Sequence, residues 1–124
     1  MGQFNGKVLL VTGGSRGIGA ATAAEFVKRG GQVAIGDVLL EQGETFAREL
    51  GVDNALFLSI DVRDPDSCAA LVNAAVKKFG RVDYLVNSAI KMAPGPLASL
   101  PLEDWRTVID VGLTGTFLMT QAFG

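Results

Sequence analysis

A glycine-rich turn near the start of the chain constrains its fold more than any other feature. Residues 8–11 form a short apolar run, residues 12–19 read Thr-Gly-Gly-Ser-Arg-Gly-Ile-Gly, and an alanine-rich helical pattern begins at about Gly17. A strand, a glycine turn and a helix are therefore predicted in this order. Such a turn directs backbone N–H groups and the positive end of the helix dipole at one volume beyond the strand, which suits a pyrophosphate.

The glycines of this turn have separate expected roles. Gly13 permits a tight turn, Gly17 lets a ligand approach the backbone, and Gly19 lets the helix pack closely on its strand. Glycines alone are weak evidence of a ligand, because a strand-to-helix turn can use them for geometry only. A second apolar strand ends at Asp37, about 20 residues after the glycines, where a carboxylate can bind a ribose. This context favours dinucleotide binding.

The remainder of the chain alternates predicted helices and strands. We expect further strands over residues 32–37, 55–60 and 82–87, and helices over residues 17–29, 40–50, 65–79 and from residue 102 onward. Asp64 is the expected N-cap of the third helix, and residues 90–101, which include three prolines, form a predicted loop. The alternation predicts an α/β fold, a Rossmann-like doubly wound parallel sheet of about four strands in the order 3-2-1-4.

Apolar spacing predicts which helix faces pack against the sheet. Ile18, Thr22 and Phe26 share one face of the first helix, and Cys68 lies among the regularly spaced apolar residues of the third helix. We therefore interpret Cys68 as a core residue rather than a nucleophile.

The composition argues against several classes of function. One cysteine and no histidine among 124 residues leave no internal disulfide and no recognisable zinc or redox cluster, so we assign no metal site. A net charge of −2, with scattered basic residues, argues against a nucleic-acid partner. No apolar run reaches the length of a membrane span, and no secretory signal is recognisable. We expect a single domain in a reducing, cytoplasmic setting.

Three motifs resemble those of one enzyme family. Residues 12–19 match a T-G-x-x-x-G-x-G cofactor motif, Asp61 with Val62 resembles an acidic position that contacts the adenine amine, and residues 87–90 resemble an N-N-A-G signature in its first and third positions. By these motifs the chain resembles the short-chain dehydrogenase/reductase family over nearly all of its length. The resemblance implies a dinucleotide site formed by Thr12, Gly13, Ser15, Arg16, Gly17, Ile18, Gly19, Asp37, Asp61, Val62, Asn87, Ser88 and Ala89.

The resemblance covers only about the first half of a family member. The family transfers a hydride between a nicotinamide and a carbonyl or alcohol, using a Tyr-x-x-x-Lys pair, a serine and an asparagine. The only tyrosine here, Tyr84, is followed four positions later by Ser88 rather than by lysine. We interpret Tyr84 as a packing residue and assign no catalytic residue to this chain.

Two departures from the family pattern lie on the catalytic side of the implied site. Gly112 aligns with the family's asparagine and offers no amide, and Ile90 aligns with the last glycine of N-N-A-G. The branched side chain of Ile90 would crowd the nicotinamide ribose. The resemblance therefore implies a chain that binds a dinucleotide but does not complete the chemistry unaided.

Charge favours NAD over NADP as the ligand. Asp37 would bond the ribose hydroxyls of NAD and repel the 2′-phosphate of NADP, whereas Arg16 acts in the opposite direction because arginine pairs with phosphate. Because Asp37 would lie at the 2′ position while Arg16 can turn into solvent, we expect NAD. The alternative is that Asp37 is a solvated acid at a strand end and Arg16 an exposed loop cation.

Three functions stay open at this point. The chain is the NAD-binding portion of a short-chain dehydrogenase in truncated form, a non-catalytic dinucleotide-binding module, or a remnant of the fold that associates through exposed surfaces. In a complete family member a fifth strand pairs with the fourth, and the fifth helix packs in a subunit interface. The resemblance therefore implies a homo-oligomer that associates through the helix containing Trp105, Leu113 and Phe117.

Overall fold

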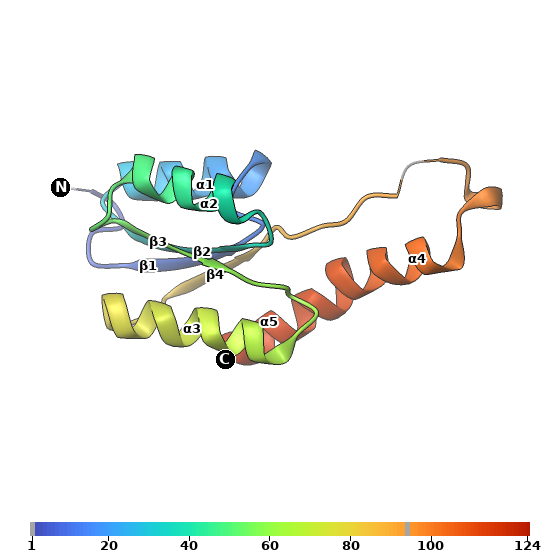
Figure 1. Cartoon of the computed structure of the whole chain (residues 1–124). Coiled ribbons are helices and arrows are strands. Elements are labelled where there is room, and N and C mark those ends of the chain that lie inside the picture. The colour runs from blue at the N-terminus through green and yellow to red at the C-terminus, as the bar shows by residue number, and fades with distance from the viewer. Residues whose placement is uncertain (1, 94) are drawn as a thin grey trace.

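The fold is a four-stranded parallel sheet with helices on both faces (Figure 1). The computed structural model describes residues 2–93 and 95–124; Met1 and Pro94, a proline of the predicted loop, lie outside the described residues. The strands are β1 (Val8–Thr12), β2 (Gln32–Asp37), β3 (Ala55–Ser59) and β4 (Tyr84–Asn87), in the order β3-β2-β1-β4. The predicted fold class and strand order are therefore confirmed.

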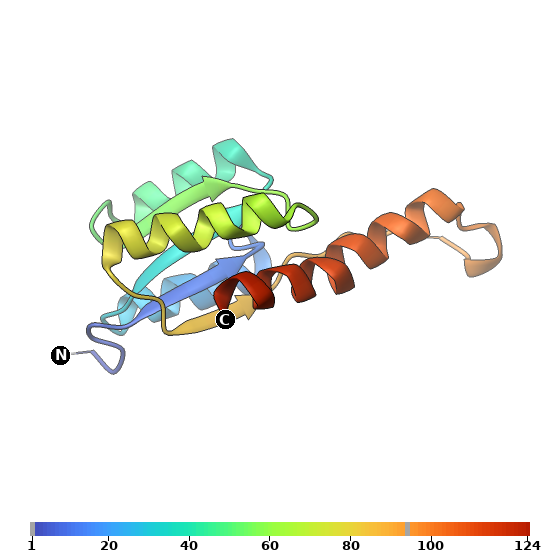
Figure 2. The same ribbon diagram turned by 90° about the horizontal axis from the view of Figure 1, so that it is seen from below.

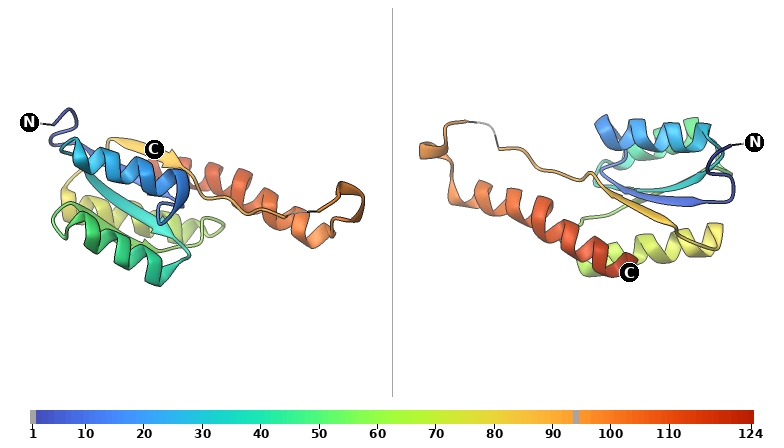
Figure 3. Two further views of the ribbon diagram at one scale, coloured as in Figure 1. Left: turned by 90° about the horizontal axis from the view of Figure 1, so that it is seen from above. Right: turned by 180° about the vertical axis from the view of Figure 1, so that it is seen from behind.

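The helices form two layers around this sheet. Helices α1 (Gly17–Lys28) and α2 (Leu40–Leu50) cover one face, and α3 (Pro65–Phe79) and α5 (Gly115–Phe123) cover the other (Figure 3). The loop after β4 contains a short 3-10 turn, Leu97–Ser99. Parallel strands place every βα connection at the same edge of the sheet.

The last helical segment projects away from the sheet. Helix α4 (Leu102–Ile109), a π-helical stretch (Asp110–Thr114) and α5 run as one continuous helix, whose first part lies well beyond the carboxyl ends of the strands (Figures 1 and 2). The predicted helix from residue 102 is confirmed, and it contains Gly112 and Gly115 as expected. The π-helical stretch around Gly112 was not predicted from the spacing, because hydrophobic periodicity does not report a single wide turn.

Alternating burial along the strands builds two cores. Leu9 and Val11 pack under α1 and α2, whereas Leu10 packs under α3 and α5, where Leu71 and Met119 are also fully buried. Each large apolar side chain buried in this way contributes about 1.5–3 kcal/mol to folding. Cys68 has no exposed surface and lies in the second core, and its burial raises the pKa of the thiol. The interpretation of Cys68 as a core residue is therefore confirmed.

The expected packing face of α1 was wrong at its first residue. Ile18 is 79% exposed, and α1 instead buries Gly19, Ala23 and Phe26. The reason is that α1 packs on the sheet through Gly19, Ala23 and Phe26, which leaves Ile18 to line the cavity at the carboxyl edge of the sheet. Elsewhere the local signals hold: the Asp64 carboxylate accepts a hydrogen bond from the Asp66 N–H at 3.0 Å, and Gly80 ends α3 in the left-handed conformation.

Strand register brings the carboxyl ends of all four strands to the same edge of the sheet. Thr12 pairs with Gly36 of β2 on one side and with Asn87 of β4 on the other, and Asp37 pairs with Ser59 of β3. Groups that follow these strands therefore meet at one edge of the sheet. Among residues 2–93 and 95–124, no helix combines the length and apolar character that a bilayer crossing requires.

Candidate functional site

The glycine turn after β1 has a backbone that only glycine accommodates. Gly13 and Gly17 have φ of 66° and 61°, in the left-handed region. A Cβ on Gly13 would lie 2.7 Å from the backbone of Ser88 and Ala89, whereas one on Gly17 would meet nothing within 4 Å. Gly13 is therefore fixed by close approach of the chain after β4, and Gly17 leaves open space at the position where a ligand is expected.

Gly19 was expected to let the helix pack closely on its strand, but its close contact is with the glycine turn. A Cβ there would lie 2.4 Å from the carbonyl oxygen of Gly13 and 3.0 Å from the Cα of Gly14. The first turn of α1 thus packs against the glycine turn itself rather than against the body of β1. This contact holds the helix N-terminus over the turn, with its free backbone N–H groups at the carboxyl edge of the sheet.

Thr12 fastens the ends of β1 and β4 to each other. Its side chain is buried, and its hydroxyl accepts hydrogen bonds from the N–H groups of Ser88 at 3.3 Å and Ala89 at 3.4 Å. The Thr12 carbonyl also accepts from Ser88 N–H at 3.1 Å. Asn87 is exposed, and its amide donates to the Thr120 hydroxyl of α5 at 3.5 Å. Thr12 and Asn87 therefore position neighbouring backbone.

Asp37 lies directly beside the glycine turn. Its carboxylate accepts hydrogen bonds from the Ser15 N–H at 3.2 Å and from the Leu39 N–H at 3.3 Å, and Gly13 N–H donates to the Gly36 carbonyl at 2.8 Å. The end of β2 is thus joined to the turn, and the carboxylate has a fixed orientation. The predicted proximity of Asp37 to the glycines is correct.

Ser15 carries a polar atom that lacks a partner. Its hydroxyl oxygen is buried and makes no hydrogen bond within the described part of the chain. Buried polar groups are nearly always hydrogen-bonded, and an exception calls for an explanation. The feature of the turn that fits a pyrophosphate group is instead Gly17, which lines the cavity described below and where a Cβ would meet nothing within 4 Å.

Asp61 follows β3 and is held by Arg63. The guanidinium donates from Nε to both carboxylate oxygens, at 2.9 and 3.1 Å, and from Nη2 to Oδ2 at 2.7 Å. These side-chain hydrogen bonds lower the pKa of Asp61, while the carboxylate raises the pKa of Arg63. Asp61 is therefore an ionised acceptor at the carboxyl edge of the sheet.

A cavity of about 760 Å³ joins these elements. Ligand-binding clefts in proteins span roughly 300–1,000 Å³, so its size suits a nucleotide. Of the predicted site residues, it is lined by Gly13, Arg16, Gly17, Ile18, Asp37, Asp61, Val62, Ser88 and Ala89. The other four, Thr12, Ser15, Gly19 and Asn87, do not line it.

Sequence reasoning missed part of the cavity wall. Besides Ile90, which was expected beside the nicotinamide ribose, the additional lining residues are Gly36, Val38, Leu39, Ile60, Arg63, Lys91, Met92, Thr107 and Val111. Most of these residues follow a strand in the sequence. They could therefore have been predicted to lie at the carboxyl edge of the sheet, beside the cavity. Thr107 and Val111 come from the projecting helix. No local sequence pattern predicts that this helix borders the cavity.

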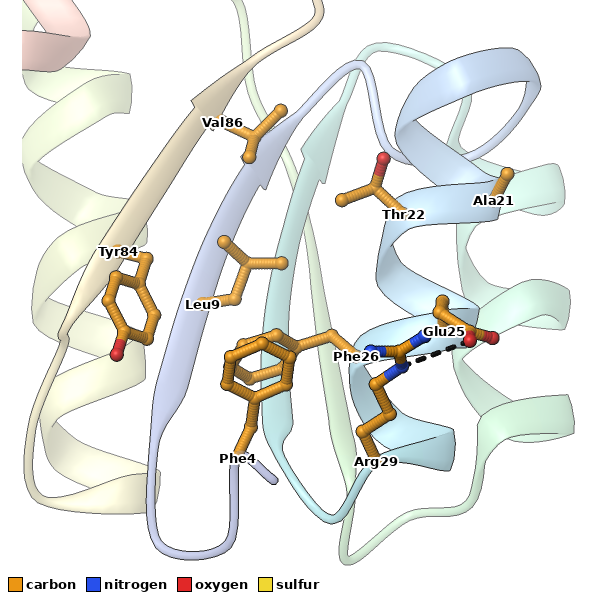
Figure 4. A pocket seen from close by; sticks show the side chains of 9 residues that line it. All are labelled: Phe4, Leu9, Ala21, Thr22, Glu25, Phe26, Arg29, Tyr84 and Val86. Carbon is orange, nitrogen blue, oxygen red and sulfur yellow. Dashed lines mark hydrogen bonds and ion pairs between the residues drawn. The ribbon is translucent and has the colours of Figure 1, made fainter. Parts of the chain in front are cut away.

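A second cavity, of about 580 Å³, lies on the other side of β1 from the second core (Figure 4). It is lined mainly by apolar side chains between α1 and the strands β1 and β4, with the Glu25–Arg29 ion pair at its rim. Phe4 stacks on Phe26 at 4.5 Å, and both rings meet Tyr84 edge-on, at 6.2 and 6.0 Å. The packing role predicted for Tyr84 agrees with these contacts, and Arg29, a cation in the cavity lining, is paired with Glu25.

The family model for short chain dehydrogenase matches residues 7–124. The chain belongs to the short-chain dehydrogenase family. It is 41% identical to a D-threitol dehydrogenase of Mycolicibacterium smegmatis over 124 residues, which are 98% of this chain and 48% of that protein. It is 40% identical to a 3-alpha-(or 20-beta)-hydroxysteroid dehydrogenase of Mycobacterium tuberculosis over 121 residues, 98% of this chain and 46% of that protein.

Solved structures of the family have the same fold. A short-chain dehydrogenase/reductase from Brucella melitensis superposes with a TM-score of 0.92 at 30% identity, over 97% of this chain and 52% of that one. One from Mycobacterium ulcerans gives a TM-score of 0.89 at 28% identity, over 97% and 46%. This short-chain dehydrogenase chain therefore spans about half the length of the relatives that it matches.

Proposed function

We propose that this chain is the NAD(H)-binding portion of a short-chain dehydrogenase/reductase-type oxidoreductase. The observation that carries the proposal is the junction of the Asp37 carboxylate with the glycine turn, where Gly17 leaves open space. When bound, the nicotinamide would supply the hydride acceptor or donor for a carbonyl or alcohol substrate.

Each part of the cavity suits one part of the dinucleotide. The turn at Gly13 and Gly17, with the N-terminus of α1, would hold the pyrophosphate, and Asp37 would accept from the adenosine ribose hydroxyls. Asp61 and Val62 would receive the adenine. The remaining wall after β4, formed by Ser88 and Ala89, would face the nicotinamide ribose.

NAD is proposed over NADP. Asp37 is fixed by two backbone N–H groups, so its negative charge cannot move away from a 2′-phosphate. Arg16 also lines the cavity, but it is exposed and has an extended backbone at the N-cap of α1. The fixed charge of Asp37 should discriminate between NAD and NADP more strongly than the mobile charge of Arg16. The Arg16 side chain would lose rotamer entropy when it paired with a 2′-phosphate.

A non-catalytic dinucleotide-binding module is the alternative function. Ile90 is 70% exposed and lines the cavity beyond Ala89, where it would meet the nicotinamide half of the ligand. Gly112 carries no side chain in the π-helical stretch next to Val111. Turnover of any carbonyl substrate by the purified chain would exclude this alternative.

We also propose that the chain associates with a second copy of itself in the cytoplasm. The projecting helix exposes Leu102, Trp105, Leu113 and Phe117, and within residues 2–93 and 95–124 β4 pairs only with β1. Exposed apolar surface and an open strand edge favour self-association. Light scattering should therefore give at least the mass of a dimer, and a clean monomer at micromolar concentration would contradict this expectation. No nucleic-acid or membrane partner is proposed.

A matched pair of glycine variants tests the proposed site. Gly17 and Gly80 both have positive φ, 61° and 84°, and a Cβ on either would meet nothing within 4 Å. Alanine at either position should therefore cost about 1 kcal/mol of stability through backbone strain. Because only Gly17 lines the cavity, Gly17→Ala should also weaken NADH binding at least tenfold.

Nicotinamide fluorescence and thermal melting provide the two readouts for this pair. Gly80→Ala should bind NADH like the unmodified chain, although its melting temperature falls with that of Gly17→Ala. Equal NADH affinities for the two variants would show that NADH does not bind at the glycine turn.

A further inference from the structure

The two ends of the larger cavity offer different groups to a ligand. In the strand order β3-β2-β1-β4, the glycine turn that follows β1 has β2 and β3 on one side and β4 on the other. A dinucleotide held at the turn by its pyrophosphate therefore extends one half over β2 and β3 and the other half over β4. Among residues 2–93 and 95–124, the acidic side chains of the cavity lining are those of Asp37, which ends β2, and Asp61, which follows β3.

The chain that leaves β4 has a fixed path beside the glycine turn. The N–H groups of Ser88 and Ala89 donate to the Thr12 hydroxyl at 3.3 and 3.4 Å, so they are already occupied. The backbone of these two residues approaches the turn so closely that a Cβ on Gly13 would lie 2.7 Å from it. The next residue, Ile90, therefore starts from a backbone position that a ligand cannot push aside.

Ile90 projects into the cavity from this fixed segment. It lines the cavity with 70% of its surface exposed. Because isoleucine is branched at Cβ, its χ1 rotamers are restricted, whereas Lys91 and Met92, which follow it in the cavity lining, are unbranched and can move away from a ligand. Of these three side chains, Ile90 is the one that takes up ligand space permanently.

The cavity wall after β4, formed by residues 88–92, is also poorly suited to a sugar. The charged residue of this wall is Lys91, whose ammonium donates hydrogen bonds but accepts none, and Ile90 and Met92 on either side of it are apolar. The hydroxyl groups of a ribose need acceptors. On the other side of the turn, the Asp37 carboxylate provides them in a fixed orientation.

We propose that this chain binds the adenosine diphosphate part of its ligand, and that Ile90 keeps the second ribose and the nicotinamide out of the cavity. This inference rests on the proposed dinucleotide site, and it narrows the ligand class to nucleotides that carry an adenosine diphosphate group. A nucleotide without nicotinamide, such as ADP-ribose, then binds as well as NADH does.

Calorimetric titrations with NADH and with ADP-ribose test this proposal, because the two ligands differ by the nicotinamide ring. A site that buried the ring would favour NADH at least about tenfold. We expect the two dissociation constants of the unmodified chain to agree within about twofold. Ile90→Ala should open the space over β4 and make NADH at least about fivefold tighter than ADP-ribose, while the affinity for ADP-ribose stays constant.

Leu97→Ala is the matched control for the loss of an exposed apolar side chain. Leu97 lies in the same loop after β4, is 81% exposed and does not line the larger cavity. This variant should bind NADH and ADP-ribose as the unmodified chain does, so that the ratio of the two affinities does not change.

The other outcomes overturn the proposal in distinguishable ways. If the unmodified chain binds NADH at least about tenfold more tightly than ADP-ribose, the dinucleotide site stands and the exclusion of the nicotinamide is wrong. If the two affinities are equal and stay equal in Ile90→Ala, Ile90 is not the residue that excludes the ring. If neither ligand binds, the proposed function is wrong and this inference is wrong with it.

Discussion

Gly19→Ala should lower the free energy of unfolding by about 3 kcal/mol and abolish detectable NADH binding. The added Cβ would lie 2.4 Å from the Gly13 carbonyl oxygen and 3.0 Å from the Gly14 Cα, and both are backbone atoms that no side-chain rotation can move. The first turn of α1 must therefore shift away from the glycine turn. That shift displaces the N–H groups that we propose to hold the pyrophosphate. Chemical denaturation and nicotinamide fluorescence measure the two effects.

Gly112→Ala is the control with the opposite expected sign. Gly112 also lies inside a helical segment, but a Cβ there would meet nothing within 4 Å. Alanine costs less conformational entropy than glycine in a helix, so this variant should be more stable by up to about 1 kcal/mol. NADH affinity should stay within about twofold. Equal destabilisation by the two substitutions would show that the close backbone contact at Gly19 is not the cause of the loss of stability.

Asp37→Asn should change the preference between cofactors by about tenfold to a hundredfold. The asparagine keeps the shape of the side chain but loses the charge, and it cannot accept from both the Ser15 and Leu39 N–H groups as strongly as the carboxylate does. Hydrogen bonds to a charged group contribute about 1.5–3 kcal/mol, so NADH affinity should fall at least tenfold. NADPH affinity should rise, because the repulsion of the 2′-phosphate is removed while Arg16 stays available.

Asp53→Asn controls for the loss of a negative charge. Asp53 is exposed in the turn before β3 and does not line the larger cavity. Its substitution should leave the ratio of NADH to NADPH affinity unchanged. If Asp37→Asn lowers both affinities by the same factor, Asp37 supports the turn rather than the choice of cofactor.

The parts of the fold that were predictable are those fixed by local backbone chemistry. The glycine turn, the Asp64 cap and the end of α3 at Gly80 each reflect a conformational requirement that the residue type itself reveals. The parallel sheet followed from alternating strands and helices, and its register then placed Asp37 beside the turn. For the same reason, the residues at the carboxyl ends of the strands were good candidates for the cavity wall.

The features that escaped prediction depend on contacts between distant segments. Ile18 fits an apolar helix face by its spacing, yet it is 79% exposed and lines the larger cavity. Thr107 and Val111 reach the cavity because a long helix projects past the strand ends, which only the tertiary arrangement shows. Arg63 lay within a recognised motif, but nothing in that motif reveals that its guanidinium holds Asp61.

The most direct test of the central claim is a titration of the chain with NADH and, separately, with NADPH, followed by nicotinamide fluorescence. Saturable binding with at least tenfold tighter association of NADH is the result expected from a fixed Asp37 carboxylate beside the glycine turn. Tighter binding of NADPH would contradict the assigned role of Asp37. Absence of binding by both would show that the turn is a structural feature of the fold and not a working cofactor site.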